Sequence, residues 1–313
     1  AGEALYAMGT VFVALSGLTI AVFYDYVPMI DRKPLKLPNG ARVAVIPYVN
    51  IEHFPEHLAG TALTTTTAAL TPDTMNYGWR DYGNRVGLWR MIDIMDPLGM
   101  RGTVCLNSDA IREYPRIIEE GCKRNWAWMG HGLNNSPESF LTHLDPEGER
   151  RVISEVLTTM EQAIGRKTKG WIGPFLSETF ETPHILADLG VEYLCDFTAD
   201  DQPFKIHTRT GSLISMPYTI ELNDVPAFLN LGQPASVFGD MIIDQFDVLY
   251  AEGATNARIM PICLHTFLVG QPFRAKHLKR ALEYIAGHSD IWLTTGDEIN
   301  DWYRKEVLAK EQA

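Results

Sequence analysis

The sequence is poor in cysteine and in basic residues. Four of its 313 residues are cysteine and no two form a CxxC pair, so neither a zinc knuckle nor a thiol redox motif is expected. We expect the four thiols to be free and buried, as in a protein of the reducing cytoplasm. The 27 lysines and arginines are outnumbered by 39 aspartates and glutamates, and the formal net charge of -12 argues against nucleic acid or an anionic membrane surface as a partner.

Several patterns that mark other fold classes are also missing. There is no low-complexity tract, no internal repeat and no glycine-rich GxGxxG turn, which disfavours a disordered chain, a solenoid and a dinucleotide-binding domain. Hydrophobic residues make up 46% of the chain, enough to bury a sizeable core. A length of 313 residues suits a single α/β barrel domain.

The N-terminal segment lacks charge. Residues 4–23 form an apolar run about long enough to cross a bilayer, yet no basic stretch precedes it as in a signal peptide. One interpretation is an arm that packs on the barrel or on a second subunit; a membrane anchor and an artefact of the gene start are the alternatives. We prefer the arm, and divide the chain into an N-terminal extension, residues 1–32, and a barrel domain, residues 33–313. A cytoplasmic protein is expected, with membrane association through the apolar run as the alternative.

The rest of the chain alternates short apolar runs, which predict strands, with amphipathic segments, which predict helices. About seven such units predict parallel strands with right-handed crossovers and, in the absence of a GxGxxG turn, a barrel. Residues 51–79 are expected to form a long functional loop. The expected strands are residues 41–50, 102–106, 126–130, 170–172, 191–195, 213–216, 259–264 and 291–293, and the expected helices include residues 84–99, 109–122, 146–165, 182–189, 235–252 and 274–288.

The carboxyl ends of the predicted strands carry the ionisable residues of greatest interest, because this is where parallel barrels place their chemistry. Asn50 and Glu52 follow the first strand at alternate positions, so both side chains are expected to point into the barrel mouth. His131 follows the third strand and His265 the penultimate one. Two histidines and a glutamate at strand ends of one barrel predict a catalytic site.

These residues lie in segments that resemble a known family. The segments are NIE at residues 50–52, HGLNN at 131–135, GWIGPFLSE at 170–178 and LHTFLVGQP at 264–272. Their order and spacing resemble the polysaccharide-deacetylase superfamily over roughly residues 24–303. RDYGNRVGLWR at residues 80–90 and HTFLVGQPFR at residues 265–274 resemble its branch of cofactor-independent allantoinases and cyclic-imide hydrolases. The resemblance implies an α/β fold, a distorted seven-stranded (β/α) barrel of the polysaccharide-deacetylase type, often in oligomers.

The sequence departs from the metal-dependent members of that superfamily. Those members have an aspartate pair after the first strand, one a base and one a metal ligand, and an HxxxH pair of further ligands. Here Asn50 and Glu52 stand in the first pair, His131 and Asn135 in the second, and Phe175 replaces an expected arginine. The resemblance therefore implies a weak Zn²⁺ or Mn²⁺ site at Glu52, His131 and Asn135, because a neutral amide is a poor third ligand. We expect no cofactor, with a divalent metal as the alternative.

Hydrolysis without a metal needs a base for water and a proton donor for the leaving group. Glu52 can be the base, provided that burial raises its pKa towards neutrality. His131 or His265 can protonate the leaving nitrogen, and the resemblance implies that His265 is a general acid. An imide or ureide suits such a site best, because its leaving group is a better anion than that of an acetamide.

Further residues are expected to line the substrate pocket, although a structural role is the alternative for several of them. Arg85 can orient an anionic or imide-like group bidentately, and the indole N–H of Trp171 can reach the site. The resemblance places the loop around Asp201 near the barrel mouth. The expected substrate-binding residues are Asn50, Arg85, Asn135, Trp171, Asp201 and Tyr218.

Three functions are open from the sequence alone. The first is a hydrolase of a non-peptide C–N bond in a small molecule, either a linear amide or a cyclic imide or ureide. The second is a metal-dependent carbohydrate de-N-acetylase, which the incomplete set of metal ligands disfavours. The third is a non-catalytic barrel that serves as a subunit or a membrane-tethered scaffold. We prefer the first, with a small-molecule substrate and assembly into a homo-oligomer.

Overall fold

The fold is seen in a computed structural model of the chain. It describes residues 23–57, 63 and 65–311, so the expectation for residues 4–22 lies outside the described part. Among the residues that are described, no helix combines the length and the apolar character needed to cross a membrane. Nothing in the described part tests the division at residue 32, which stays a prediction.

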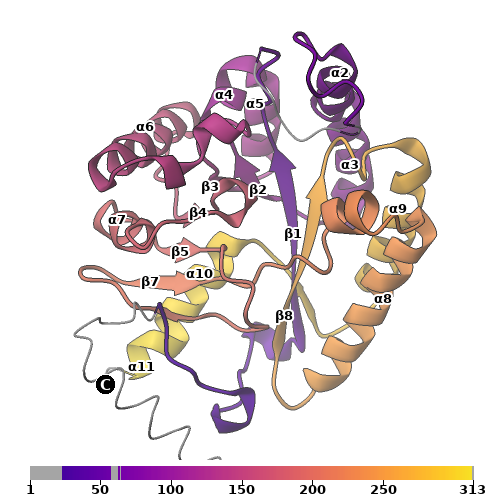
Figure 1. Ribbon diagram of the computed structural model, residues 1–313. Helices are drawn as coiled ribbons and strands as arrows, with labels where there is room; N and C mark the ends of the chain where they lie inside the picture. The colour runs from indigo at the N-terminus through magenta and orange to yellow at the C-terminus, as the bar shows by residue number, and fades with distance from the viewer. Residues whose placement is uncertain (1–22, 58–62, 64, 312–313) are drawn as a thin grey trace, which may run out of the picture.

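A curled sheet of nine strands forms the centre of the molecule (Figure 1). Its path runs β6-β7-β5-β4-β3-β2-β1-β8, and β9 pairs with the beginning of β1. All neighbours on this path are parallel except β6, which runs antiparallel to β7. The strands are β1 (Val43–Ile51), β2 (Thr103–Leu106), β3 (Ala127–Gly130), β4 (Gly170–Trp171), β5 (Tyr193–Leu194), β6 (Phe204–Ile206), β7 (Leu213–Ser215), β8 (Arg258–His265) and β9 (Ile291–Leu293).

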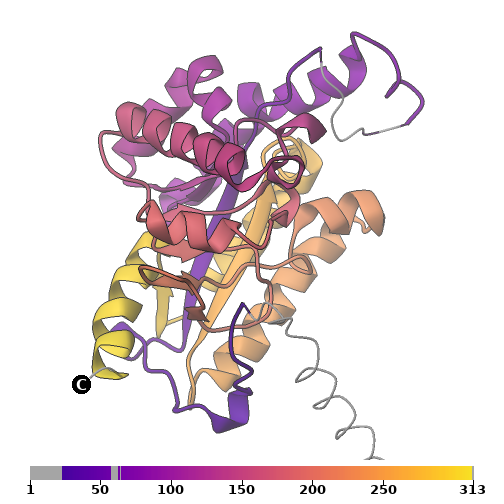
Figure 2. The same ribbon diagram turned by 60° about the vertical axis from the view of Figure 1, so that its left-hand side comes forward.

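Most helices lie outside the sheet, as Figures 1 and 2 show from two directions, whereas α10 packs Ile299 and Tyr303 into the hydrophobic cluster of the barrel interior. The α4–α7 helices flank the β2–β7 side, while α8 and α9 pack on each other beside β8. The helices are α2 (Thr74–Tyr82), α3 (Leu88–Met95), α4 (Ser108–Glu113), α5 (Pro115–Lys123), α6 (Pro146–Ile164), α7 (Thr182–Asp188), α8 (Ala235–Glu252), α9 (Pro272–Ala286), α10 (Gly296–Tyr303) and α11 (Ala309–Glu311).

The first strand shows how alternation divides the core. Every residue of β1 is buried, because it lies inside the sheet with β8 along one edge and β2 and β9 along the other. Val45 and Val49 face the helices, whereas Ile46 and Tyr48 face the barrel interior. Asn50 continues the interior series, and Glu52 follows it at the mouth.

The expected fold class is confirmed as a parallel α/β half-barrel with most of its helices outside. Seven strands, β1–β5, β7 and β8, form the parallel path. β9 lies at residues 291–293, as expected from the sequence, whereas the antiparallel β6 was not expected. β6 is only three residues long, too short for a period of two to stand out.

The segment expected to be one long loop, residues 51–79, is wrong in its last part, since α2 begins at Thr74. Asp73 caps this helix by accepting the Asn76 backbone N–H at 3.3 Å. A π-helical turn at Gly83–Gly87 then joins α2 directly to α3. The segment TMNYGWRDY carries no continuous apolar stripe, because it packs beside the barrel mouth, where polar side chains find partners.

Candidate active site

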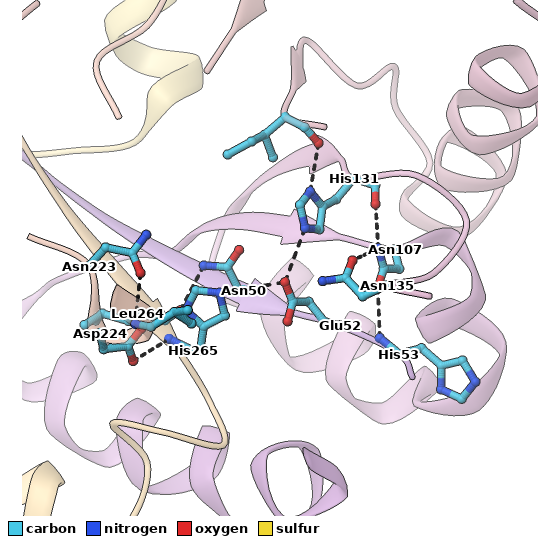
Figure 3. A network of polar contacts seen from close by, with 12 residues as sticks. Asn50, Glu52, His53, Asn107, His131, Asn135, Asn223, Asp224, Leu264 and His265 are labelled. Atoms are coloured by element: carbon cyan, nitrogen blue, oxygen red, sulfur yellow. Dashed lines mark hydrogen bonds and ion pairs between the residues drawn. The ribbon is translucent and has the colours of Figure 1, made fainter. Parts of the chain in front are cut away.

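Three strand ends bring the expected catalytic side chains together. Glu52 follows β1, His131 follows β3, and His265 ends β8, directly paired with Asn50 of β1. Figure 3 shows both imidazole rings directed at the Glu52 carboxylate. The Nε2 atoms of His131 and His265 lie 3.3 and 3.8 Å from the same oxygen, Oε1 of Glu52. All three residues are buried, with exposed fractions of 7% for Glu52, 3% for His131 and 8% for His265.

The other nitrogen of each ring defines where the protons are. Nδ1 of His131 lies 2.8 Å from the carbonyl oxygen of Ile172, which can only accept, so this Nδ1 carries a hydrogen. Nδ1 of His265 is 2.7 Å from Oδ1 of Asp224 and donates in the same way. Each neutral ring would therefore turn an unprotonated Nε2 towards a carboxylate oxygen. The contacts between these Nε2 atoms and Oε1 of Glu52 are favourable only when at least one of the three groups carries a proton at the contact.

The pKa of Glu52 corrects an expectation from the sequence. Burial by itself raises this pKa, but attraction to His265 and the hydrogen bond with His131, together with one from Asn135, outweigh burial and leave the pKa below its ordinary value. The expected rise towards neutrality is therefore wrong. Glu52 is a carboxylate at neutral pH because cationic and donor groups surround it.

Asp224 gives His265 the opposite shift. Burial lowers the pKa of His265, but the charges of Asp224 and Glu52 and the hydrogen bond to Asp224 more than compensate, so this pKa is raised. The other oxygen of Asp224 accepts the His265 backbone N–H at 2.7 Å, and Asp224 is fully buried. The imidazole is thus held in place and kept cationic. The only sequence signal for Asp224 was its place in a loop after a strand.

Asn135 does not present a metal ligand. The backbone N–H of His53 donates to Oδ1 of Asn107 at 2.9 Å, which turns Nδ2 of Asn107 towards Oδ1 of Asn135 at 3.1 Å. The oxygen of Asn135 is therefore engaged, and its amide N–H₂ faces Glu52, where it lowers the pKa of the carboxylate by donating. Asn107, which the sequence did not single out, sets this orientation.

The expected metal site consequently fits a divalent cation poorly. Zn²⁺ in proteins normally takes at least three side-chain ligands. Of Glu52, His131 and Asn135, only the first two could offer a lone pair to a cation. Nor do the described residues contain any cluster of three or more His, Cys, Asp or Glu suited to a metal ion.

Two of the expected substrate-binding residues lie together inside the barrel near Glu52. Asn50 donates from Nδ2 to the carbonyl oxygen of Leu264 at 3.1 Å, and its side chain also hydrogen-bonds to Tyr218. Tyr218 packs edge-on against Tyr48, with ring centroids 4.9 Å apart. Asn50, Tyr218 and Asn135 thus stay predicted substrate contacts.

The other three expected substrate contacts lie away from the catalytic trio of Glu52, His131 and His265. Trp171 is fully buried and packs against Gly130 and Val156 on the helix side, because alternation turns the side chain after the inward-facing Gly170 outward. The side chain of Arg85 is 74% exposed and pairs with Asp81 at 3.8 Å.

Asp201 lies at the opposite end of the barrel. Its carbonyl oxygen accepts the backbone N–H of Ile259 at 2.9 Å, at the beginning of β8. His265 is at the end of the same strand, about 20 Å away at roughly 3.3 Å per residue. The expected role of Asp201 in substrate binding is therefore wrong, because the loop after β5 folds back along the sheet.

Fold and site together define a parallel α/β half-barrel with a buried glutamate between two histidines at its mouth. The chain matches the sequence profile of the family "Polysaccharide deacetylase" over residues 64–194. It is 25% identical over 310 residues to a protein of Schizosaccharomyces pombe (strain 972) that carries the provisional name of a polysaccharide deacetylase, covering 86% of this chain and 92% of the relative.

Solved structures show the same architecture. A probable polysaccharide deacetylase from Pseudomonas aeruginosa PAO1 superposes with a TM-score of 0.80 at 24% identity, covering 90% of this chain and 98% of that one. The allantoinase Puue superposes with a TM-score of 0.79 at 24% identity, covering 90% of this chain and 99% of that one. A protein from Mycobacterium smegmatis described as a polysaccharide deacetylase gives a TM-score of 0.73 at 22% identity, covering 90% and 96%.

The resemblance inferred from the sequence is thereby confirmed: residues 64–194 match the polysaccharide deacetylase profile, and the chain has a fold that a probable polysaccharide deacetylase shares with an allantoinase. The match over residues 64–194 supports the expected class of enzyme, a hydrolase of amidohydrolase type that acts on C–N bonds.

Proposed function

We propose that this protein hydrolyses an amide or a cyclic imide or ureide of a small molecule without a metal ion. The arrangement that carries the proposal is the Glu52 carboxylate between Nε2 of His131 and Nε2 of His265, at 3.3 and 3.8 Å. A base and a cationic acid then lie within reach of one another in a buried site.

In the proposed reaction, Glu52 takes a proton from water as the water oxygen bonds to the substrate carbonyl carbon. The C–N bond breaks as the departing nitrogen takes a proton from Nε2 of His265, leaving a carboxyl group and a free N–H. Glu52 then returns its proton to His265 over the 3.8 Å that separates them, which restores the site. His131 stabilises the developing negative charge through Nε2 when it is protonated.

The chemistry favours an activated substrate. A base with a lowered pKa is a weak base, and Asn135 donates to that base instead of holding a cation that could polarise a carbonyl. An imide or ureide needs less assistance than an acetamide, because its nitrogen leaves as a stabilised anion. The small-molecule substrate and a homo-oligomeric assembly complete the proposal.

The family match favours a second candidate, a metal-dependent de-N-acetylase of a carbohydrate, since the matched profile and several similar proteins carry the deacetylase name. In that case Glu52 and His131 would hold the metal. The third ligand would have to be water, or the side-chain oxygen of Asn135 after its amide group turns round.

The experiment that separates the two candidates combines metal analysis with chelation. Purified protein is screened against hydantoins, cyclic imides and N-acetylated sugars, before and after EDTA treatment. We expect hydrolysis of an imide or ureide that survives chelation and is lost in Glu52→Gln, which keeps shape and removes basicity. The matched control is Glu221→Gln, which replaces an exposed carboxylate. Near-stoichiometric metal together with activity that EDTA abolishes and Zn²⁺ restores would establish the second candidate instead.

A further inference from the structure

Arg80 on α2 is a buried arginine whose charge has no ion-pair or hydrogen-bond partner at its Nε and Nη2 atoms among the described residues. The residue is 7% exposed, and its guanidinium lies over the ring of Phe54, 4.2 Å from the ring centroid. Phe54 is two positions after Glu52 in the chain. Burial lowers the pKa of Arg80 to about 10, against the attraction of Glu52 and Asp73, so it is still cationic at neutral pH.

Asn84 ties the helical segment that carries Arg80 to the backbone of Glu52. Nδ2 of Asn84 donates to the backbone carbonyl of Glu52 at 3.0 Å. Arg80 and Asn84 are four residues apart on the continuous helical path from α2 into the π-helical turn, so their side chains emerge on neighbouring turns of one face. Oδ1 of Asn84 is also buried and has no partner among the described residues.

These unpartnered atoms make a definite pattern. Two N–H donors of a cation and one amide acceptor are withdrawn from water next to the catalytic carboxylate, and each such group left unpaired costs free energy. A buried polar group left unpaired in a native structure has a specific cause, such as a catalytic role or a bound species that supplies the partner. The ligand that satisfies this set has an anionic oxygen for Arg80 and a neighbouring N–H for Asn84.

We propose that Arg80 and Asn84 form the subsite for a carboxylate-bearing substrate, an amide, imide or ureide with an acidic group close to its N–H. The proposal rests on the hydrolase function proposed above and names its substrate class. Arg80 supplies the fork that binds a carboxylate with two parallel hydrogen bonds. It also offsets the repulsion that the Glu52 carboxylate and the net charge of -12 would exert on an anionic substrate.

The first test measures binding without turnover. Unfolding temperature is recorded as acetate is added, with acetamide as the uncharged probe of similar shape and sodium chloride to hold ionic strength constant. We expect acetate, and not acetamide, to raise the unfolding temperature of the wild type in a saturable way. Arg80→Met, which keeps the stem packed on Phe54, should weaken the apparent acetate affinity at least about tenfold.

Two further variants complete this test. Arg80→Lys keeps the charge but loses the fork, and should fall between wild type and Arg80→Met. Arg112→Gln is the matched control, since its side chain is 73% exposed and pairs with Glu113 at 2.9 Å, and it should respond to acetate as the wild type does. A wild type that does not respond to acetate, or an Arg80→Met protein that responds equally, would overturn the subsite. Either outcome leaves the hydrolase proposal standing, because no catalysis is measured.

Arg80 could alternatively act only as a counter-charge that positions Glu52, and kinetics separate the two roles. With imides that differ only in a carboxylate, we expect Arg80→Met to reduce kcat/KM at least about tenfold more for the acidic imide than for the neutral one. Equal losses on both substrates, with the acidic limb of the pH profile moved upward, would assign Arg80 to positioning and overturn the subsite.

Discussion

At the scale of single residues, the charge next to each imidazole determines what that imidazole can do. Both oxygens of Asp224 accept hydrogen bonds from His265, one from the ring and one from the backbone N–H. The negative charge of Asp224 raises the pKa of His265, so the ring stays protonated and can act as an acid. His131 has only a backbone carbonyl behind its Nδ1. The two histidines lie at similar distances from Glu52, but only His265 has a carboxylate behind its ring, which suits a division between proton donor and charge stabiliser.

Asp224→Asn tests this division. The carboxylate raises the pKa of His265, so its removal should lower that pKa, and His265 should lose its proton at a lower pH. We expect the alkaline limb of the kcat/KM profile to move to lower pH and the plateau to fall roughly tenfold or more, as measured over a pH series on an imide substrate.

Asp188→Asn is the matched control for Asp224→Asn, because Asp188 lies on α7 and pairs with Arg150 at the surface. Its pH profile should equal that of the wild type. If Asp224→Asn loses activity while its alkaline limb stays in place, Asp224 only supports the local structure and does not set the proton affinity of His265.

At the scale of elements, the π-helical turn between α2 and α3 is packed directly on the loop that follows β8. A Cβ at Gly87 would collide with the carbonyl oxygen of Thr266 and lie 3.3 Å from Cα of Gly270. The loop begins at His265, so this contact links the helical segment carrying Arg80 and Asn84 to the end of β8. Glycine is required here by close approach and not by its backbone angles.

Gly87→Ala should therefore lower stability by about 1–3 kcal/mol, the usual cost of inserting a methyl group into a filled space. It should also reduce activity, because the backbone next to His265 must move. Thermal unfolding and kcat/KM are the measurements.

Gly78→Ala on α2 serves as the comparison, since a Cβ there meets no atom within 4 Å and should be neutral or stabilising by about 0.5–1 kcal/mol. Equal unfolding temperatures for the two variants would contradict the close-packing argument.

At the scale of the whole molecule, a pair of buried acids beside the site couples folding to pH. Both carboxylate oxygens of Glu178 are buried without a hydrogen-bond partner of good geometry among the described residues. Burial, followed by the charge of Asp196, raises the pKa of Glu178 well above its ordinary value. The folded protein therefore holds a proton that the unfolded chain releases, so stability falls as pH rises from about 4 through the raised pKa.

Glu178→Gln replaces this group by a neutral one of the same shape. Its unfolding free energy should exceed that of the wild type above neutrality, and the advantage should disappear towards about pH 4, where Glu178 is protonated in both states. Denaturant unfolding across this range measures the difference, with Glu221→Gln as the exposed control. A Glu178→Gln protein less stable than wild type above neutrality would mean that Glu178 is bound as an anion.

Much of the fold and part of the site were accessible from local pattern. Apolar runs of four or more residues predicted β1, β2, β3 and β8 closely, because a strand buried on both faces needs such a run. Alternation along β1 predicted that Asn50 and Glu52 share the inward face. The polar residues after strand ends identified Glu52, His131 and His265, which the structure brings together.

The sequence by itself thus determined the class of fold and the three ionisable residues at its mouth, since periodicity and strand ends are properties of neighbouring residues. Only the tertiary structure decided that the pKa of Glu52 is lowered, that Asn135 faces it as a donor and that Asp201 lies at the far end of the barrel. It also brought Arg80 to the site, with Nε and Nη2 unpaired among the described residues. Electrostatic fields and hydrogen-bond directions depend on groups far apart in the chain, so they are set only once the folded barrel brings those groups together.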